Sequence, residues 1–181
     1  MITKPSNYDN INENGASRKL PMGAYVCIIR KVTDVTDKQY LQIDYDVCEG
    51  EYKGIAVDAY EAWGTWNHSF RVYYTEKSMW RLKKFITRVE RTNPNFTFDW
   101  SKPECLVNKG IGLIIGIRQY YSNKDGSLKE ALDVQDFCTA TEIREDNLPS
   151  QPRVVEPKTP MPTPKMEAVS DEEYDSDSLP F

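Results

Sequence analysis

Tyr40-Leu-Gln-Ile-Asp-Tyr-Asp-Val47 is the stretch in which apolar and polar side chains alternate most clearly. Leu41, Ile43 and the apolar residues at every second position after them share one face, and Gln42 shares the other face with two aspartates. A period of two is that of a strand with one face against a core. The stretch therefore predicts a half-buried β-strand and a mainly β domain.

Other segments rich in Val, Ile and aromatic residues also predict strands. In chain order they are 24–35, 55–62, 111–118 and 128–141. The aromatic and polar segment 63–70 is expected to be a loop, and 71–74 to extend again briefly. Glycines at 110, 112 and 116 indicate that the fourth strand is sharply curved or bulged.

One helix is expected between the third and fourth strands. Thr75 can cap its first turn, and Asn93-Pro94 ends it. Its apolar residues recur at helical spacing and are Met79, Leu82, Phe85, Ile86 and Val89. Three strands, one helix and a final hairpin predict a five-stranded closed barrel of the oligonucleotide/oligosaccharide-binding (OB) type, because closure removes exposed edges.

The C-terminal part of the chain differs sharply in composition. Six of the eleven prolines lie between Pro149 and Pro164. Residues from Glu142 onward carry a net charge of −6 against −5 for the whole chain, so residues 1–141 carry about +1. We divide the chain into a flexible lead-in (1–20), a barrel domain (21–145), a Pro-rich disordered linker (146–170) and an acidic tip (171–181).

The tip is suited to capture by another protein. It reads Asp171-Glu-Glu-Tyr-Asp-Ser-Asp-Ser-Leu-Pro-Phe181, with five carboxylates and no basic residue before an apolar end. Basic side chains of a partner would bind the carboxylates, and an apolar pocket of the partner would bind the apolar end. The residues expected to bind a partner are Asp171, Glu172, Glu173, Asp175, Asp177, Leu179, Pro180 and Phe181.

This tip resembles the C-terminal peptide of bacterial and phage single-stranded-DNA-binding proteins, an acidic run that closes on Pro-Phe. The family more often has Ile where Leu179 stands. The strand and helix pattern over about 23–141 is similar to the OB barrel of the same family. The resemblance implies binding of single-stranded DNA and recruitment of replication, recombination or repair proteins (helicase, primase, polymerase or recombinase class) through the tip. It also implies location in the cytoplasm, of a bacterial host if the chain is phage-encoded.

Aromatic side chains beside basic ones would supply the DNA-binding surface. Every nucleotide of a single strand offers a phosphate and an exposed base face, so stacking platforms interleaved with Lys and Arg bind it without sequence preference. The chain has eleven Tyr and four Trp. The candidates are Lys53, Tyr60, Trp63, Trp66, Phe70, Arg71, Tyr73, Arg118 and Tyr120. If 71–74 is a strand, either Tyr73 or Tyr74 faces the core instead.

Other classes of function find less support. The single histidine, His68, and four dispersed cysteines give no catalytic triad and no paired metal ligands, so we expect no enzyme, cofactor or metal. No apolar run has membrane-spanning length and the N-terminus lacks a signal-peptide pattern, so no membrane association is expected.

Two alternatives to the DNA-binding interpretation stay open. One is a phage or plasmid adaptor that binds a host replication protein through its tail, without DNA binding by the barrel. The other is a mediator that loads an annealing protein onto single strands. The strand 40–47 could also pair between subunits, so a homo-oligomer is among the states that the sequence allows.

Overall fold

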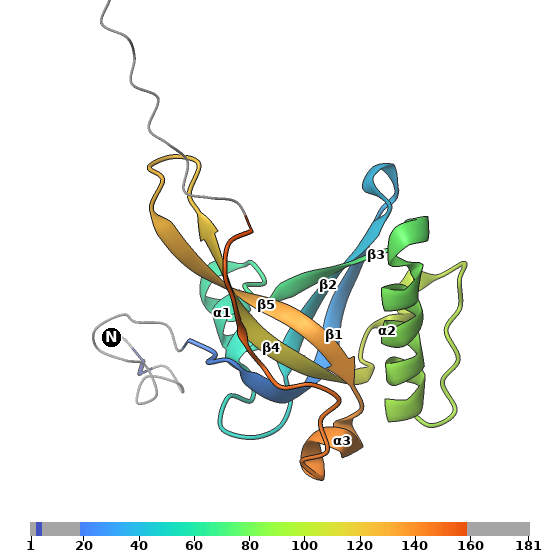
Figure 1. Cartoon of the computed structure of the whole chain (residues 1–181). Helices are drawn as coiled ribbons and strands as arrows, with labels where there is room; N and C mark the ends of the chain where they lie inside the picture. The colour runs from blue at the N-terminus through green and yellow to red at the C-terminus, as the bar shows by residue number, and fades with distance from the viewer. Residues whose placement is uncertain (1–2, 5–18, 159–181) are drawn as a thin grey trace, which may run out of the picture.

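The structure is a computed structural model that describes residues 3–4 and 19–158 (Figure 1). Its strands are β1 (Gly23–Val35), β2 (Tyr40–Val47), β3 (Ser69–Tyr73), β4 (Gly110–Tyr121), β5 (Leu128–Cys138) and β6 (Val154–Val155). Its helices are α1 (Ile55–Trp63), α2 (Met79–Thr92) and α3 (Ala140–Arg144). Short 3-10 turns are η2 (Thr36–Lys38), η3 (Glu76–Ser78) and η4 (Pro103–Leu106).

Five antiparallel strands form one sheet in the order β3-β2-β1-β4-β5. The long strand β1 serves two neighbours: its first half pairs with β4 and its second half with β2, with a register shift between Ile29 and Lys31. The mainly β class and the helix between the third and fourth strands are confirmed. Within the described residues no ladder joins β3 to β5, so the sheet is open at that seam.

The predicted strand at 55–62 is wrong, because this segment is helix α1. Gly54 before it adopts a left-handed backbone with φ of 80°, and Gly64 after it closes the last turn by donating its N–H to the carbonyl of Tyr60. The carboxylate of Asp46 accepts the backbone N–H of Ala56 at 2.8 Å, which satisfies a free donor of the first turn. The third strand is instead β3, in the segment expected to be a loop and a brief extension.

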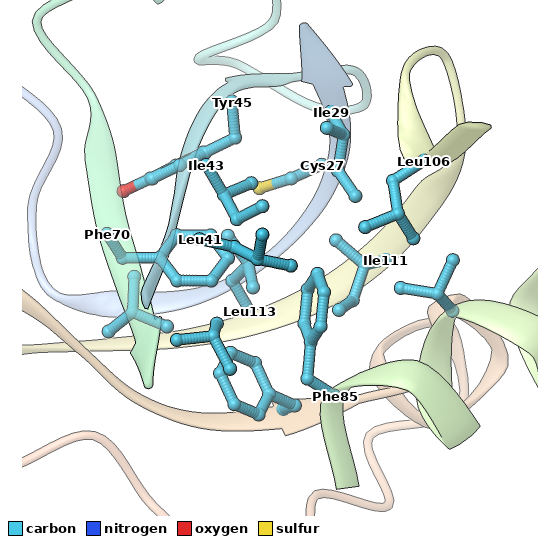
Figure 2. Close-up of a cluster of buried hydrophobic side chains, with 14 of the residues drawn as sticks. Cys27, Ile29, Leu41, Ile43, Tyr45, Phe70, Phe85, Leu106, Ile111 and Leu113 are labelled. Atoms are coloured by element: carbon cyan, nitrogen blue, oxygen red, sulfur yellow. The ribbon is translucent and has the colours of Figure 1, made fainter. Parts of the chain in front are cut away.

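The core lies between one face of the sheet and helix α2. Figure 2 shows Phe85 among side chains of the sheet such as Ile111 and Leu113. The predicted apolar stripe of α2 is confirmed from Leu82 to Val89, whereas Met79 is 45% exposed. The hydroxyl of Thr75 makes no cap hydrogen bond, and the 3-10 turn η3 leads into α2 instead.

Part of the expected linker is attached to the sheet. Strand β6 pairs in parallel with Ile117 and Arg118 of β4, beyond the point where β1 leaves that strand. The side-chain amide of Gln135 brackets the backbone of Arg153: its Nε2 donates to the carbonyl at 2.6 Å and its Oε1 accepts the N–H at 3.1 Å. The remainder of the linker, 159–170, and the tip lie outside the described residues. None of the helices in the described ranges has the length and apolar composition that crossing a membrane requires.

Candidate nucleic-acid interface

Two tyrosines and an arginine meet on the face of β2 and β3 that points away from the core. Tyr40 lies directly opposite Tyr73 in the ladder, and their ring centroids are 5.2 Å apart with a 58° tilt. The guanidinium carbon of Arg71 is 4.9 Å from the centroid of the Tyr40 ring. Because Leu41 and Val72 face the core, alternation turns these three side chains to the other face, where Arg71 and Tyr73 are exposed and Tyr40 is buried beneath them.

Polar residues of three strands extend this surface. Lys31 and Thr33 of β1 pair with Asp44 and Gln42 of β2, and Ser69 of β3 pairs with Asp44 on the other side. We call the surface the outer-face patch and define it as Lys31, Thr33, Tyr40, Gln42, Asp44, Ser69, Arg71 and Tyr73. Cations stand on two strands: Arg71 lies next to the tyrosine pair, and Lys31 lies at the opposite end of the patch, so aromatic rings and positive charge share one face, as stacking and phosphate contact require.

Asp44 adds a negatively charged side chain to the patch. Its side chain is buried, and desolvation raises its pKa, although Lys31 and a hydrogen bond with Gln42 act in the opposite direction. A buried carboxylate repels phosphate but accepts hydrogen bonds from base edges. The end of the patch at Asp44 therefore suits bases, and phosphates are favoured toward Arg71.

Helix α1 brings a second set of aromatic side chains to the same side of the sheet. Its first turn is tied to β2, because the backbone N–H of Ala56 donates to Asp46, which lies on the same face of β2 as Asp44, two residues further on. The rings of Tyr60 and Trp66 stack on each other with centroids 4.5 Å apart and planes 19° apart. Trp63 is 74% exposed at the end of α1, and Lys53 is exposed in the turn before it.

Phe70 is not available to a nucleic acid, contrary to the sequence-based prediction. It is 9% exposed, and its ring lies 5.6–5.8 Å from the rings of Tyr45, Phe85 and Phe137. The alternation of β3 explains this, because Phe70 and Val72 share the face that points to the core while Arg71 and Tyr73 share the other.

Arg118 and Tyr120 lie apart from the outer-face patch. Both are exposed on the far half of β4, where the guanidinium carbon of Arg118 is 6.0 Å from the centroid of the Tyr120 ring. Strand β1 stands between β4 and β2 in the sheet. The structure thus gathers Arg71 and Tyr73, adds the α1 aromatics on the same side, and separates the β4 pair.

Sequence reasoning missed Tyr40, Lys31 and Gln42. The alternation of 40–47 already turned Gln42 outward, and the same period carries Tyr40 to that side. What the sequence lacked was the register, since nothing local shows that Tyr40 stands opposite Tyr73.

No protein-family model matches the chain, and no curated protein matches it in sequence. Within residues 3–4 and 19–158, no three His, Cys, Asp or Glu side chains lie together in a way that could hold a metal ion. The patch itself is therefore the basis on which a function can be argued.

Proposed function

We propose that this protein binds single-stranded DNA without sequence preference through the outer-face patch, and that its acidic tip recruits replication, recombination or repair proteins. The observation that carries the proposal is the placement of Arg71 against Tyr40, with Tyr73 beside it, on the face of the sheet that points away from α2. Tyr73 is 39% exposed, so its ring can take a base.

A single strand fits this surface better than a duplex does. Its bases present free faces, and each base stacked on an aromatic ring contributes about 1–3 kcal/mol. A duplex hides those faces and offers mainly phosphates, which call for a strongly basic surface. Residues 1–141 carry a net charge of only about +1. Stacking rather than bulk charge is thus the proposed source of affinity.

We further propose that the sheet is the wall of an OB-type barrel. Its strand order leaves β3 and β5 as the two edges that closure would join, and the rings of Phe70 and Phe137 make contact between these strands. Helix α2 follows β3 and precedes β4, as that connectivity demands.

The experiment is a titration of fluorescently labelled oligo-dT with the full chain, measured by anisotropy at about 50 and 200 mM salt. Duplex of equal length is the control, and oligo-rU tests DNA against RNA. Tight binding of oligo-dT with a shallow salt dependence and little binding of duplex supports the proposal. No binding at the lower salt refutes it and leaves the adaptor interpretation as the better account.

The role of the tip has its own test. A chain lacking 171–181 should bind oligo-dT as tightly as the full chain or more tightly, because five carboxylates that could compete with phosphate are gone. The same chain should no longer retain replication or recombination proteins from a host extract, whereas the full chain does. Weaker oligo-dT binding after the deletion would contradict competition between tip and DNA.

A further inference from the structure

A cavity of about 310 Å³ opens beside the N-terminal end of helix α2. Residues of three regions line it: Asp34 and Leu41 of the β1–β2 hairpin, Tyr74, Met79 and Leu82 around the start of α2, and Phe98, Trp100 and Pro103 of the loop after it. Figure 1 shows this hairpin projecting beside one end of α2. The volume is at the low end of the range for ligand sites, about 300–1,000 Å³, so a single ring system suits it better than a folded segment.

Trp100 is held in place at the mouth of this cavity although it is 70% exposed. Its ring meets Phe98 edge-on, with centroids 5.0 Å apart. The carboxylate of Asp99 accepts hydrogen bonds from the backbone N–H and the hydroxyl of Ser101 at 2.9 and 2.6 Å, and the backbone N–H of Phe98 donates to Glu90 at 2.9 Å. Hydrogen bonds thus hold the loop residues on both sides of Trp100. An exposed indole on such a loop is preorganised to stack against another ring.

The cavity continues the outer-face patch around the end of the sheet. Tyr73 belongs to the patch and the next residue, Tyr74, lines the cavity; Tyr40 and Leu41 are divided in the same way. Because consecutive residues of a strand point to opposite faces, a strand of nucleotides that crosses the tyrosine pair reaches the cavity by passing around the end of β3.

We propose that this cavity is a second subsite for the same single strand and takes one nucleobase, stacked against Trp100. The inference rests on the proposed function. Its lining includes an exposed polar pair, since the hydroxyl of Tyr74 donates to the carboxylate of Asp34 at 2.8 Å. The amino or imino N–H of a base can donate to the remaining lone pairs of that carboxylate.

The polar pair of Tyr74 and Asp34 favours a base over the acidic tip of this chain. The side chains of Leu179 and Phe181 would cover the Asp34 carboxylate without offering it a hydrogen bond. The five carboxylates that precede them would add like charge beside Asp34. A nucleobase covers the apolar side chains that line the cavity and also donates a hydrogen bond to Asp34.

The test compares two exposed tryptophans. Trp100→Ala in the full chain should weaken binding of oligo-dC by about 5- to 150-fold, the value of one stacked base. Trp80→Ala is the matched control, because Trp80 is 65% exposed on α2 and does not line the cavity. The affinity of the Trp80→Ala variant for oligo-dC should stay within about twofold of that of the unmodified chain. Thermal unfolding of both variants shows whether either has lost its fold.

A second readout does not depend on losing Trp100. The variant W63F/W66F/W80F keeps Trp100 as the one indole of the sequence, so its quenching by oligo-dC reports contact at the cavity. Unchanged affinity of Trp100→Ala together with no quenching overturns the subsite while oligo-dT binding by the unmodified chain still stands. Quenching by a synthetic 171–181 peptide, but not by oligo-dC, overturns it in favour of the tip. Failure of the unmodified chain to bind any single strand removes the subsite and the proposed function together.

Discussion

The rings of Phe70 on β3 and Phe137 on β5 lie 5.6 Å apart, although the described residues show no hydrogen-bonded ladder between these two strands. Phe85 of α2 contacts both rings, at 5.8 and 5.3 Å between centroids. Three aromatic side chains thus connect the edges of the sheet where backbone pairing stops. Helix α2 also holds β5 through Arg81, which donates to the backbone carbonyls of Val134 and Gln135, and through Lys84, which pairs with Asp136.

Phe85→Ala is therefore expected to lower the free energy of unfolding by about 3–5 kcal/mol, because it empties a fully buried site between two strands. Urea unfolding followed by far-UV circular dichroism measures the loss. Trp80→Ala, on the exposed side of the same helix, should change the same free energy by less than about 0.5 kcal/mol. Equal losses in the two variants would show that α2 does not act through the Phe85 ring.

Arg71 and Tyr73 should contribute to binding in different ways. Tyr73→Ala is expected to cost about 1–3 kcal/mol in affinity for oligo-dT at every salt concentration, since stacking is uncharged. Arg71→Ala is expected to weaken binding and to reduce the slope of log affinity against log salt by about 1, the loss of one phosphate contact. Arg91→Ala removes the same charge from an exposed site at the end of α2 and serves as the control. A slope that changes equally in both arginine variants would remove Arg71 from the site.

Asp44 predicts a pH dependence of binding. Desolvation raises its pKa, so as the pH falls this carboxyl takes up a proton before an ordinary aspartate does, which removes negative charge from the patch. Affinity for oligo-dT should rise as the pH falls. Asp44→Asn should bind more tightly than the unmodified chain at pH 7.5, with the advantage shrinking toward pH 5. The control is Asp37→Asn in the η2 turn; an identical pH profile in both variants would contradict the role of Asp44.

The elements that could be located from the sequence are those whose apolar residues recur with a regular spacing within one short segment. The period of two correctly located β2 and its core face, and the helical spacing correctly located α2. The expected half-buried strand is wrong in one respect, because Asp44 and Asp46 on the second face of β2 are buried as well. The strand prediction for 55–62 was wrong because Ile55, Val57 and Ala59 fall on alternate positions, which is also the pattern of a strand. What makes it a helix is partly non-local, namely the hydrogen bond from Ala56 to Asp46. The glycines at 54 and 64 were the local signal that favoured a helix.

In the candidate site, too, local features could be predicted from the sequence and features that depend on strand pairing could not. Exposure of Trp63 and Arg71 could be predicted from residue type and setting, whereas Phe70 was misplaced because the boundary of β3 decides which side chains turn inward. One residue of difference in a strand exchanges its two faces. The neighbours of Tyr40 depend on pairing between β2 and β3, which no stretch of sequence contains by itself.

His68 predicts that stability falls in mild acid. Its ring is buried beside Tyr45, its Nδ1 has no hydrogen-bond partner among the residues that the structure describes, and desolvation lowers its pKa below the ordinary 6.5. Below about pH 6.5 the unfolded chain gains a proton that the folded chain resists, so unfolding becomes easier until the folded pKa is passed. His68→Phe keeps a ring against Tyr45 and should lose less stability than the unmodified chain between about pH 7.5 and 5.5, measured by urea unfolding. Since His68 is the one histidine of the sequence, parallel losses in the two proteins would contradict this assignment.

Gly116 should control the attachment of the segment around Arg153. A Cβ at this position would lie 2.1 Å from the Gln135 side chain and 2.4 Å from the backbone carbonyl oxygen of Arg153, so Gly116→Ala must displace one or both. Tryptic cleavage after Arg153 is expected to become faster in the folded protein. Gln135→Ala, which removes two hydrogen bonds to Arg153, should act in the same direction. Gln119→Ala, which alters only an exposed pair with Glu130, is the control and should leave the cleavage rate unchanged.

The short strand β6 also bears on solubility. Beyond Gly116 the side of β4 that β1 has left would otherwise present bare N–H and C=O groups, a template on which another extended chain can add. Val154 and Val155 cover it, and Pro152 and Pro157 bracket them with residues that cannot donate a backbone hydrogen bond. The chain thus terminates strand growth at this edge with its own proline-bounded segment, and cutting the protein after α3 would uncover a site for aggregation.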